Sequence, residues 1–303
     1  MPRRSTYGFL LLLAACEARI AGAPREPGAD VDAGADPSDA AGSGDAGMIA
    51  PWSTPAPVSV AATTTAIEDD VTLSSDTLEM FFAIDTGNAG KDLYYTARSS
   101  PTGTWTKPIL LAFNSATQSD ETPRLSADDR TLYYASGRAG NGTLDIYSVT
   151  RAVAGGTTWS APSRLAGINT TTLTEKWYMP CGTNHYVMVQ TQTATLADLV
   201  EGTVGSPPTP IGELNSAQNE TGTFVTSDCL TIYFASNRSG TSMLYTSSRA
   251  SLTAKFAPPT VVTDFMIPGG NGNEEDPWMS PDGRTFAFAS DAAGTKDVYL
   301  STR

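Results

Sequence analysis

Short runs of aromatic and aliphatic residues, each preceded by a polar turn, recur along most of the chain. Four clear copies occupy residues 75–83, 128–136, 228–236 and 282–290, and a weaker copy occupies 181–189. The corresponding turn positions 76, 128, 181, 228 and 282 are 52, 53, 47 and 54 residues apart. A period of about 50 residues is typical of a four-stranded propeller blade with long loops.

Two further marks keep the same period and predict four strands per repeat, which we name a to d in chain order. Strand a precedes the turn, strand b is the apolar run, strand c carries Tyr-x-x-x-Arg, and strand d carries an aromatic residue followed three places on by proline. Proline suits strand d because the outermost strand of a blade has a free edge. The Tyr/Arg pairs are 94/98, 147/151, 245/249 and 299/303, and the aromatic/proline pairs are 52/55, 105/108, 159/162 and 256/259, with 207/210 as a degenerate copy.

The two ends of the repeat array are out of phase by one strand. The first motif in the chain is the aromatic/proline motif of a strand d, at Trp52. The last is the Tyr-x-x-x-Arg motif of a strand c, which ends at Arg303. A ring without an open edge forms if the N-terminal strand d pairs with the C-terminal strands. We therefore predict an all-β, five-bladed β-propeller over residues 51–303, closed by an N-terminal outer strand that completes the C-terminal blade. An open stack of blades is the alternative.

The repeat resembles the WD-like propeller repeat of the TolB type. Residues 275–283, Glu-Asp-Pro-Trp-Met-Ser-Pro-Asp-Gly, closely match its acidic-Pro-x-x-Ser-Pro-Asp-Gly strand and turn, and residues 121–128 match it well. Blades one and four keep the outline without the prolines, and blade three departs most. The resemblance implies a propeller that serves as a periplasmic platform for partners, and it implies no single reaction.

The N-terminus has the pattern of an export signal. Two arginines within the first four residues precede an apolar run at 9–15, which is too short to cross a bilayer as a mature helix. The sequence Leu-Ala-Ala-Cys at 13–16 resembles the bacterial lipobox, in which the cysteine is lipidated. We therefore expect a signal peptide at 1–15 and a membrane anchor at Cys16. A plain signal peptide with an incidental cysteine is the alternative.

The composition of residues 16–50 predicts a disordered acidic tether. After the first few positions they are mostly Ala, Gly, Asp, Pro and Ser, which bury too little apolar surface to offset the entropy of ordering the chain. Glu17 follows the cysteine where an aspartate would favour inner-membrane retention. We therefore expect a lipid-anchored protein of the bacterial cell envelope, at the outer membrane and facing the periplasm or the cell surface.

Composition limits the classes of partner. The chain has 303 residues, of which 40% are hydrophobic and 17% charged, as in globular proteins. Its 19 Lys and Arg against 32 Asp and Glu give a net charge of −13, and nucleic acid is excluded because it requires clustered positive charge. One histidine and three cysteines leave too few ligands for most zinc sites. We expect an envelope protein or a glycan as partner, and no cofactor.

Acidic residues recur at the start of strand a, which lines the channel of a propeller. We expect each carboxylate to bind backbone N–H groups of its own loop. Alternatively, they ring one mouth of the channel and attract a cationic partner or Ca²⁺; the segment 271–276 is the best local candidate, although its spacing is not that of an EF-hand. The candidates for the channel mouth are Asp69, Glu121, Glu220, Glu275 and Asp276, and the other acids at this position are Glu68, Asp70, Asp120, Glu175 and Glu274.

Two functional classes remain open. We expect a non-catalytic binding or scaffolding platform, with no catalytic residue and no metal assigned. A carbohydrate-active hydrolase is the alternative, because a five-bladed propeller can hold paired carboxylates in its central pit. The Asp-box of sialidases is not met, since Asp282 and Gly283 are adjacent. His185, the single histidine, is predicted to be a packing or hairpin residue.

Cys181 and Cys229 fall at neighbouring positions in the a–b turns of adjacent blades. Export favours disulfide bonds, and removal of Cys16 by lipidation leaves an even number of thiols. A Cys181–Cys229 disulfide is our hypothesis, and two independent buried thiols are the alternative.

Overall fold

The structure is a computed structural model, and it describes residues 50–58, 66–85, 90–191, 196–270 and 272–303. The predicted signal peptide, Cys16 and the tether up to residue 49 lie outside the described residues. All regular elements within these ranges are β-strands. The described ranges include no helix with the length and hydropathy needed to cross a membrane.

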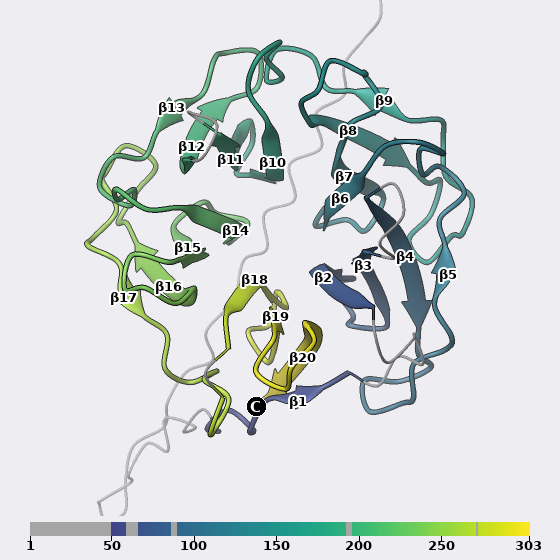
Figure 1. The fold of residues 1–303 in the computed structure, drawn as a ribbon, viewed down its shortest axis with the longest axis vertical. Helices are drawn as coiled ribbons and strands as arrows, with labels where there is room; N and C mark the ends of the chain where they lie inside the picture. Colours follow the sequence, from purple (N-terminus) through teal and green to yellow (C-terminus); the bar gives the residue numbers. More distant parts are fainter. Residues whose placement is uncertain (1–49, 59–65, 86–89, 192–195, 271) are drawn as a thin grey trace, which may run out of the picture. The chain divides into compact units, whose positions relative to one another are not determined.

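The strands form five four-stranded antiparallel sheets arranged as the blades of a propeller (Figure 1). Blades 1 to 3 are β2 (Ile67–Leu73), β3 (Glu79–Asp85), β4 (Lys91–Ala97) and β5 (Ile109–Leu110); β6 (Asp120–Leu125), β7 (Thr131–Ser136), β8 (Asp145–Thr150) and β9 (Ser163–Arg164); and β10 (Glu175–Cys181), β11 (His185–Thr191), β12 (Ala197–Thr203) and β13 (Thr209–Pro210). Blades 4 and 5 are β14 (Glu220–Val225), β15 (Thr231–Ser236), β16 (Met243–Ser248) and β17 (Thr260–Val261); and β18 (Glu274–Met279), β19 (Thr285–Ser290), β20 (Asp297–Thr302) and β1 (Ala56–Pro57).

The N-terminal outer strand closes the ring, as the phase of the repeats predicts. In blade 5 the order is β1-β20-β19-β18, and β1 pairs antiparallel with β20 through Ala56 and Leu300. The contact continues beyond the strand, because the guanidinium carbon of Arg303 lies 4.3 Å from the ring centroid of Trp52. Figure 1 shows β1 beside β20 at the edge of the last blade. The five-bladed architecture is therefore confirmed.

The recurring arginine and aromatic residue form one clamp in each of four blades. The arginine Nε donates to a carbonyl of the a–b turn in its own blade, and its guanidinium covers the aromatic ring that precedes strand d. The aromatic residue lies in the c–d loop, immediately before the outer strand. The Nε–oxygen distances are 2.8 Å for Arg98 to Thr77, 2.6 Å for Arg151 to Asp129, 3.0 Å for Arg249 to Cys229 and 2.7 Å for Arg303 to Gly283.

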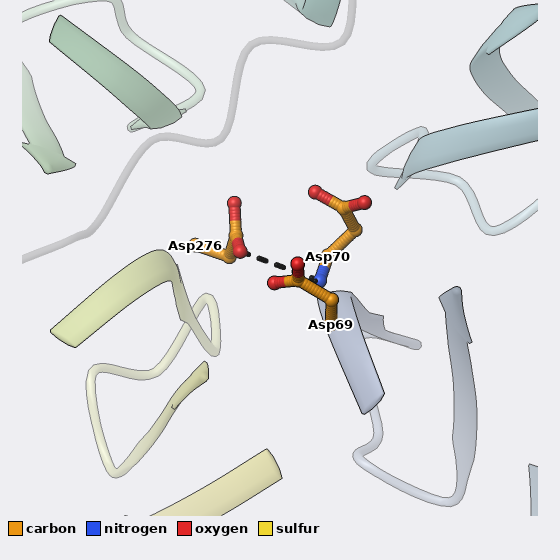
Figure 2. A group of neighbouring side chains, drawn as sticks. All are labelled: Asp69, Asp70 and Asp276. Carbon is orange, nitrogen blue, oxygen red and sulfur yellow. Dashed lines mark hydrogen bonds between the residues drawn. The ribbon is translucent and has the colours of Figure 1, made fainter. Parts of the chain in front are cut away.

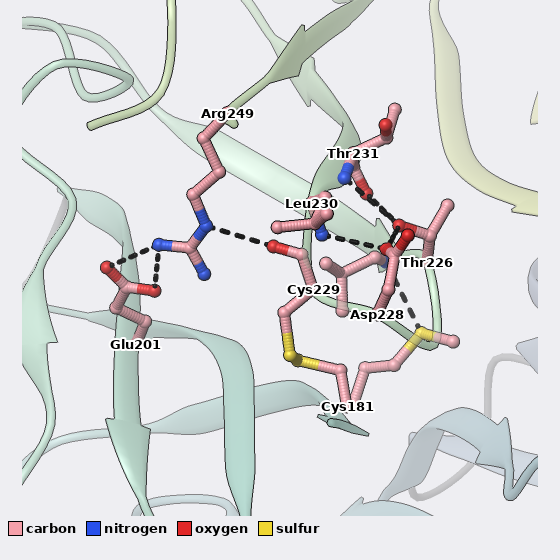
Figure 3. The surroundings of a disulfide bond; sticks show 10 residues. Cys181, Glu201, Thr226, Asp228, Cys229, Leu230, Thr231 and Arg249 are labelled. Carbon is pink, nitrogen blue, oxygen red and sulfur yellow. Dashed lines mark hydrogen bonds and ion pairs between the residues drawn. A yellow bond between two sulfur atoms is a disulfide. The ribbon is translucent and has the colours of Figure 1, made fainter. Parts of the chain in front are cut away.

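Blade 3 has no arginine at this position, and its a–b turn is held differently. Cys181 is joined by a disulfide bond to Cys229 in the turn of blade 4, and Gly182 N–H donates to the Ser227 carbonyl at 2.7 Å. Figure 3 shows the disulfide directly beside the Arg249 clamp of blade 4. His185 is the first residue of β11 and lies opposite Cys181, so it is a hairpin residue.

Every innermost strand contains a β-bulge at the same position. The register shifts between Asp69 and Thr72 in β2, and equivalently in β6, β10, β14 and β18. A bulge re-aims the side chains on either side of it and locally bends the strand. Each bulge has a residue with φ between 48° and 59°: Asp70, Thr122, Trp177, Gly222 and Asp276.

At Gly222 the bulge tolerates no side chain. A Cβ added there would lie 2.6 Å from the backbone nitrogen of Asp276, well below any normal contact. The backbones of blades 4 and 5 are therefore in close contact at their bulges.

We expect Trp52→Ala to lower the free energy of unfolding by about 2 kcal/mol. Its ring packs edge-on against Phe265 at 4.9 Å and Phe286 at 6.3 Å, and each aromatic pair contributes about 0.5–1.5 kcal/mol beyond its buried area. Urea unfolding measures the change, with Val153→Ala on an exposed loop as control. A loss under 0.5 kcal/mol would mean that the seam does not depend on this contact.

Candidate functional site at the channel centre

Three buried aspartates from two adjacent blades meet at the channel centre (Figure 2). One carboxylate oxygen from each of Asp69, Asp70 and Asp276 lies within 4.8 Å of the others. The indole Nε1 of Trp177, from blade 3, donates to Asp70 at 3.1 Å and to Asp276 at 2.8 Å. The bulges bring these groups together, because Asp70, Trp177 and Asp276 are equivalent positions of three innermost strands.

Lysine side chains form ion pairs with the cluster at the end of the channel where the innermost strands begin. Lys91 Nζ lies 2.8 Å from Asp69 and 3.0 Å from Asp70. Lys296 pairs with Glu275 and lies 3.4 Å from Asp69. The alternating charges continue around the channel in the order Glu275, Lys296, Asp69, Lys91, Glu121 and Lys176, with 3.0 Å between the last two.

Arg124 supplies a further positive charge from β6. Its side chain is 1% exposed, its Nε donates to the Thr223 carbonyl at 3.1 Å, and its Nη1 donates to the carbonyls of Val71 and Pro123 at 3.0 Å each. Burial lowers the pKa of Arg124, and the nearby carboxylates of Asp69 and Asp70 oppose this effect. The guanidinium thus bridges blades 1, 2 and 4 beside the acidic cluster.

The pKa values of Asp69 and Asp276 are shifted in opposite directions. Burial raises the pKa of Asp276 well above its usual range, and the charges of Asp69 and Asp70 raise it further. Burial also opposes ionisation of Asp69, but the hydrogen bond from Asp276 and the charges of Lys91 and Lys296 lower its pKa below the usual range. Asp276 therefore carries the proton and donates to the Asp69 carboxylate.

Lysine and arginine charges match the carboxylate charges in and around the cluster when Asp276 is protonated. With Asp276 protonated, the negative groups are Asp69, Asp70, Glu121 and Glu275, and the positive groups are Lys91, Lys176, Lys296 and Arg124. A Ca²⁺ ion is held by several oxygen ligands that are free to face it. Here the same oxygens face ammonium, indole and carboxyl donors.

This proton assignment predicts different effects for two isosteric substitutions. We expect Asp276→Asn to cost less than about 1 kcal/mol of stability, since an amide can also accept from Trp177 and donate to Asp69. We expect Asp69→Asn to cost about 2 kcal/mol, because it removes the charge between Lys91 and Lys296. Urea unfolding at pH 7 compares them, and equal costs would contradict the assignment.

Glu220 lies apart from this cluster. It accepts from Ser216, from Ser236 and from Arg238 at 3.0 Å, all within its own blade. Asp120 and Glu175, at the same position of blades 2 and 3, likewise accept backbone N–H bonds from their own loops. Of the five predicted mouth residues, the structure brings together Asp69, Glu121, Glu275 and Asp276.

The segment 271–276 does not converge on one point. Asn271 lies outside the described residues, and Asn273 donates to Asp291. Glu275 pairs with Lys296, whereas Asp276 faces Trp177. Consecutive side chains of this strand therefore have different partners.

Glu68 and Glu274 occupy the position of Glu220 in blades 1 and 5, where no arginine faces them among the described residues. Burial raises the pKa of each to about 7, with a further contribution from Asp297 at Glu68 and from Asp291 at Glu274. Their ordinary value is 4.5, so the folded protein binds more protons than the unfolded chain between these values.

Stability should therefore fall as pH rises from about 5 to about 7, because the folded state loses the protons that it binds preferentially. We expect the double substitution Glu68→Gln and Glu274→Gln to flatten this part of the profile. Unfolding free energies at pH 5, 6, 7 and 8 measure the slope, with Glu213→Gln in another loop as control. An unchanged slope in the double variant would contradict the pKa values of these two groups.

The other end of the channel is open and apolar. A cavity of about 370 Å³ lies among the ends of the innermost strands and the a–b turns. Each blade contributes an apolar side chain to its wall: Leu73, Leu125, Met179, Phe224 and Trp278. We call this cavity the funnel. The channel thus has a charged, closed centre and an open apolar mouth at the a–b turns.

No protein-family model and no curated protein matches the chain. Among solved structures, an endo-arabinase from Bacteroides thetaiotaomicron aligns with a TM-score of 0.56 at 11% identity, over 83% of this chain and 97% of that one. A GH62 α-L-arabinofuranosidase catalytic domain from Coprinopsis cinerea aligns with a TM-score of 0.54 at 11% identity, over 83% and 96%. A protein of Agrobacterium tumefaciens assigned to TolB aligns with a TM-score of 0.49 at 16% identity, over 78% and 77%. The likeness is one of fold. At 11% identity the endo-arabinase and the arabinofuranosidase share only the propeller with this chain, and no activity follows from that.

Proposed function

We propose that the protein is a lipid-anchored envelope protein whose propeller is a non-catalytic binding platform for a protein partner. The observation that carries the proposal is the contrast between the two ends of the channel. The central carboxylates are buried and neutralised by Lys91, Lys296 and Arg124, whereas the funnel is open and lined by side chains from all five blades. A preformed apolar cavity is the common form of a binding site.

The closed centre argues against hydrolysis. A glycoside hydrolase needs two carboxyl groups about 5–10 Å apart with room for a sugar and a water molecule between them. Here the oxygens of Asp69 and Asp276 lie within 4.8 Å of each other, and both residues are buried. The ammonium groups of Lys91 and Lys296 lie 2.8 and 3.4 Å from Asp69.

One observation favours the second candidate, a carbohydrate-active hydrolase. Asp69 and Asp276 have pKa values shifted in opposite directions, so that one carboxyl is protonated and its neighbour is ionised. Paired carboxyls in these two states are what acid–base hydrolysis uses. For catalysis, Lys91 and Lys296 would have to move away from them.

Hydrolysis of aryl glycosides, including 4-nitrophenyl α-L-arabinofuranoside, separates the two candidates. The platform predicts that the purified protein and its Asp276→Asn variant release nitrophenol at the same background rate. A rate at least a hundredfold above background that Asp276→Asn abolishes would establish the hydrolase instead. The location is tested separately by [³H]palmitate labelling of intact cells, which Cys16→Ala should abolish.

A further inference from the structure

We infer that the partner inserts an apolar side chain, flanked by lysine or arginine, into the funnel. This inference rests on the proposed function and adds the chemistry of the partner. Three features of the same face support it: the size and lining of the funnel, the charge of its rim, and exposed apolar residues on the c–d loops.

The funnel has room for an inserted side chain. Its volume of about 370 Å³ exceeds that of one large aliphatic or aromatic side chain, and its wall contains the rings of Phe224 and Trp278. Its shape is fixed by the clamps and by the Cys181–Cys229 disulfide, which hold the a–b turns. A preformed apolar pocket of this kind receives an anchor residue with little loss of entropy.

The rim of the funnel carries an excess of negative charge. Four exposed aspartates lie at or next to its lining residues, one in each of four turns: Asp76, Asp128, Asp228 and Asp282. Three exposed positive groups oppose them: Arg130 and Arg284 on the same turns, and Arg303, which donates to the Gly283 carbonyl of the blade 5 turn. The balance at the mouth is therefore negative, and it favours a cationic neighbour for the inserted side chain.

The rim carboxylates keep one oxygen available for a partner. Within each turn a Ser or Thr hydroxyl and a backbone N–H bind Oδ1 of the aspartate, as at Asp228 and Asp282. The side-chain hydroxyl and the N–H two residues further on thus meet at the same carboxylate oxygen in both turns. The hydroxyl bond to Oδ1 also lowers the pKa of Asp128, Asp228 and Asp282, so the rim is ionised.

The c–d loops lie at the same end of the blades as the a–b turns, and they expose apolar side chains on the same face as the funnel. Val153, Val204 and Leu252 are 57%, 50% and 39% exposed at the tips of these loops in blades 2, 3 and 4. Exposed aliphatic residues around a pocket, with charge at its rim, are typical of protein interfaces. An anionic lipid surface is disfavoured, because it would meet the rim aspartates with like charge.

Binding of synthetic peptides by isothermal titration calorimetry tests this chemistry. The probe is acetyl-Gly-Lys-Lys-Phe-Lys-Gly-amide, and the matched peptides replace Phe by Ser or all Lys by Glu. We expect both changes to weaken binding at least tenfold, and the affinity of the probe to fall as salt rises. Equal binding of all three peptides, or no binding of the probe at millimolar concentration, would overturn the inference.

Two variants locate the binding. Ala127 is exposed and lines the funnel, so Ala127→Trp should fill it and weaken probe binding at least tenfold. Ala116→Trp places the same side chain on an exposed loop at the opposite end and should change binding less than twofold. Circular dichroism and urea unfolding check that both variants fold. Equal weakening by both, or by neither, would contradict the assignment to the funnel.

Vesicle binding and glycoside hydrolysis distinguish a different partner from a different function. Sedimentation of the protein with vesicles of 3:1 phosphatidylcholine and phosphatidylglycerol, blocked by Ala127→Trp, would replace the protein partner by a membrane. If the probe peptide does not bind and no glycoside is hydrolysed, the inferred partner chemistry is wrong, but the proposed platform function is not affected. Hydrolysis that depends on Asp276 refutes the proposed function itself.

Discussion

Arg124→Ala should lower the free energy of unfolding by about 3–5 kcal/mol, the range found when one partner of a buried charged network is removed. The substitution deletes three hydrogen bonds, to the carbonyls of Thr223, Val71 and Pro123, and leaves those acceptors buried. It also removes one of four positive charges from a cluster that is balanced only when all four are present. The loss should therefore exceed that of a cavity of the same size.

Urea unfolding at pH 7 measures the effect, and Arg130→Ala is the matched control. Arg130 is exposed on the a–b turn of the same blade, and we expect its removal to cost less than 0.5 kcal/mol. Combining Arg124→Ala with Asp276→Asn should give nearly the sum of the two effects, because Asp276 is already neutral. A loss below 1 kcal/mol for Arg124→Ala would show that the acidic cluster does not need this charge.

Replacement of Cys181 and Cys229 by Ala should cost about 4 kcal/mol. The disulfide closes a loop of 48 residues, and constraining a loop of this length in the unfolded chain accounts for an effect of that size. Blade 3 would be affected most, since its turn has no arginine clamp. Guanidinium unfolding under non-reducing conditions measures the loss.

Alkylation of the denatured, unreduced protein tests the same bond chemically. We expect the peptides containing positions 181 and 229 to be unmodified before reduction and fully modified after it. Modification before reduction would mean two independent thiols, and the double substitution would then cost far less. Reduction of the native protein should produce the same destabilisation as the double substitution.

The fold could be predicted because its determinants are local and repeated. The Tyr-x-x-x-Arg mark and the aromatic residue ahead of each outer strand meet in one clamp, so each repeat carries its own signature. The phase difference between Trp52 and Arg303 was sufficient to predict the closure of the ring. Blade 3 was hardest to delimit because its disulfide replaces the clamp that marks the other blades.

The centre of the channel could be predicted only in part. The acidic residues were visible, but their partners come from other strands, and the bulges decide which side chains meet. Lys91 and Lys296 lie near the starts of strands c, where the repeat has no recurring mark. The sequence did contain a sign of Arg124. When the innermost strands are aligned, Arg124 is the one charged residue at a position that Thr72, Met179, Phe224 and Trp278 occupy in the other blades.

The funnel could not be foreseen from the sequence for a related reason. Its lining residues have the apolar character expected of a blade core, and only their position at the end of the channel distinguishes them. Leu125 lies between Arg124 and Ser126, and Phe224 lies between Thr223 and Val225, as ordinary strand residues of a blade would. Whether such a side chain packs between blades or lines a cavity depends on the spacing of the five sheets around the axis.

Site-specific photo-cross-linking in intact cell envelopes tests the central claim, that the funnel is the binding end of the channel. A benzoylphenylalanine at position 127 is compared with one at position 116, in the wild-type background and with Asp276→Asn. We predict a discrete adduct from position 127 that the acetyl-Gly-Lys-Lys-Phe-Lys-Gly-amide peptide suppresses and Asp276→Asn leaves unchanged. An adduct from position 116 alone, or one that requires Asp276, would contradict the account.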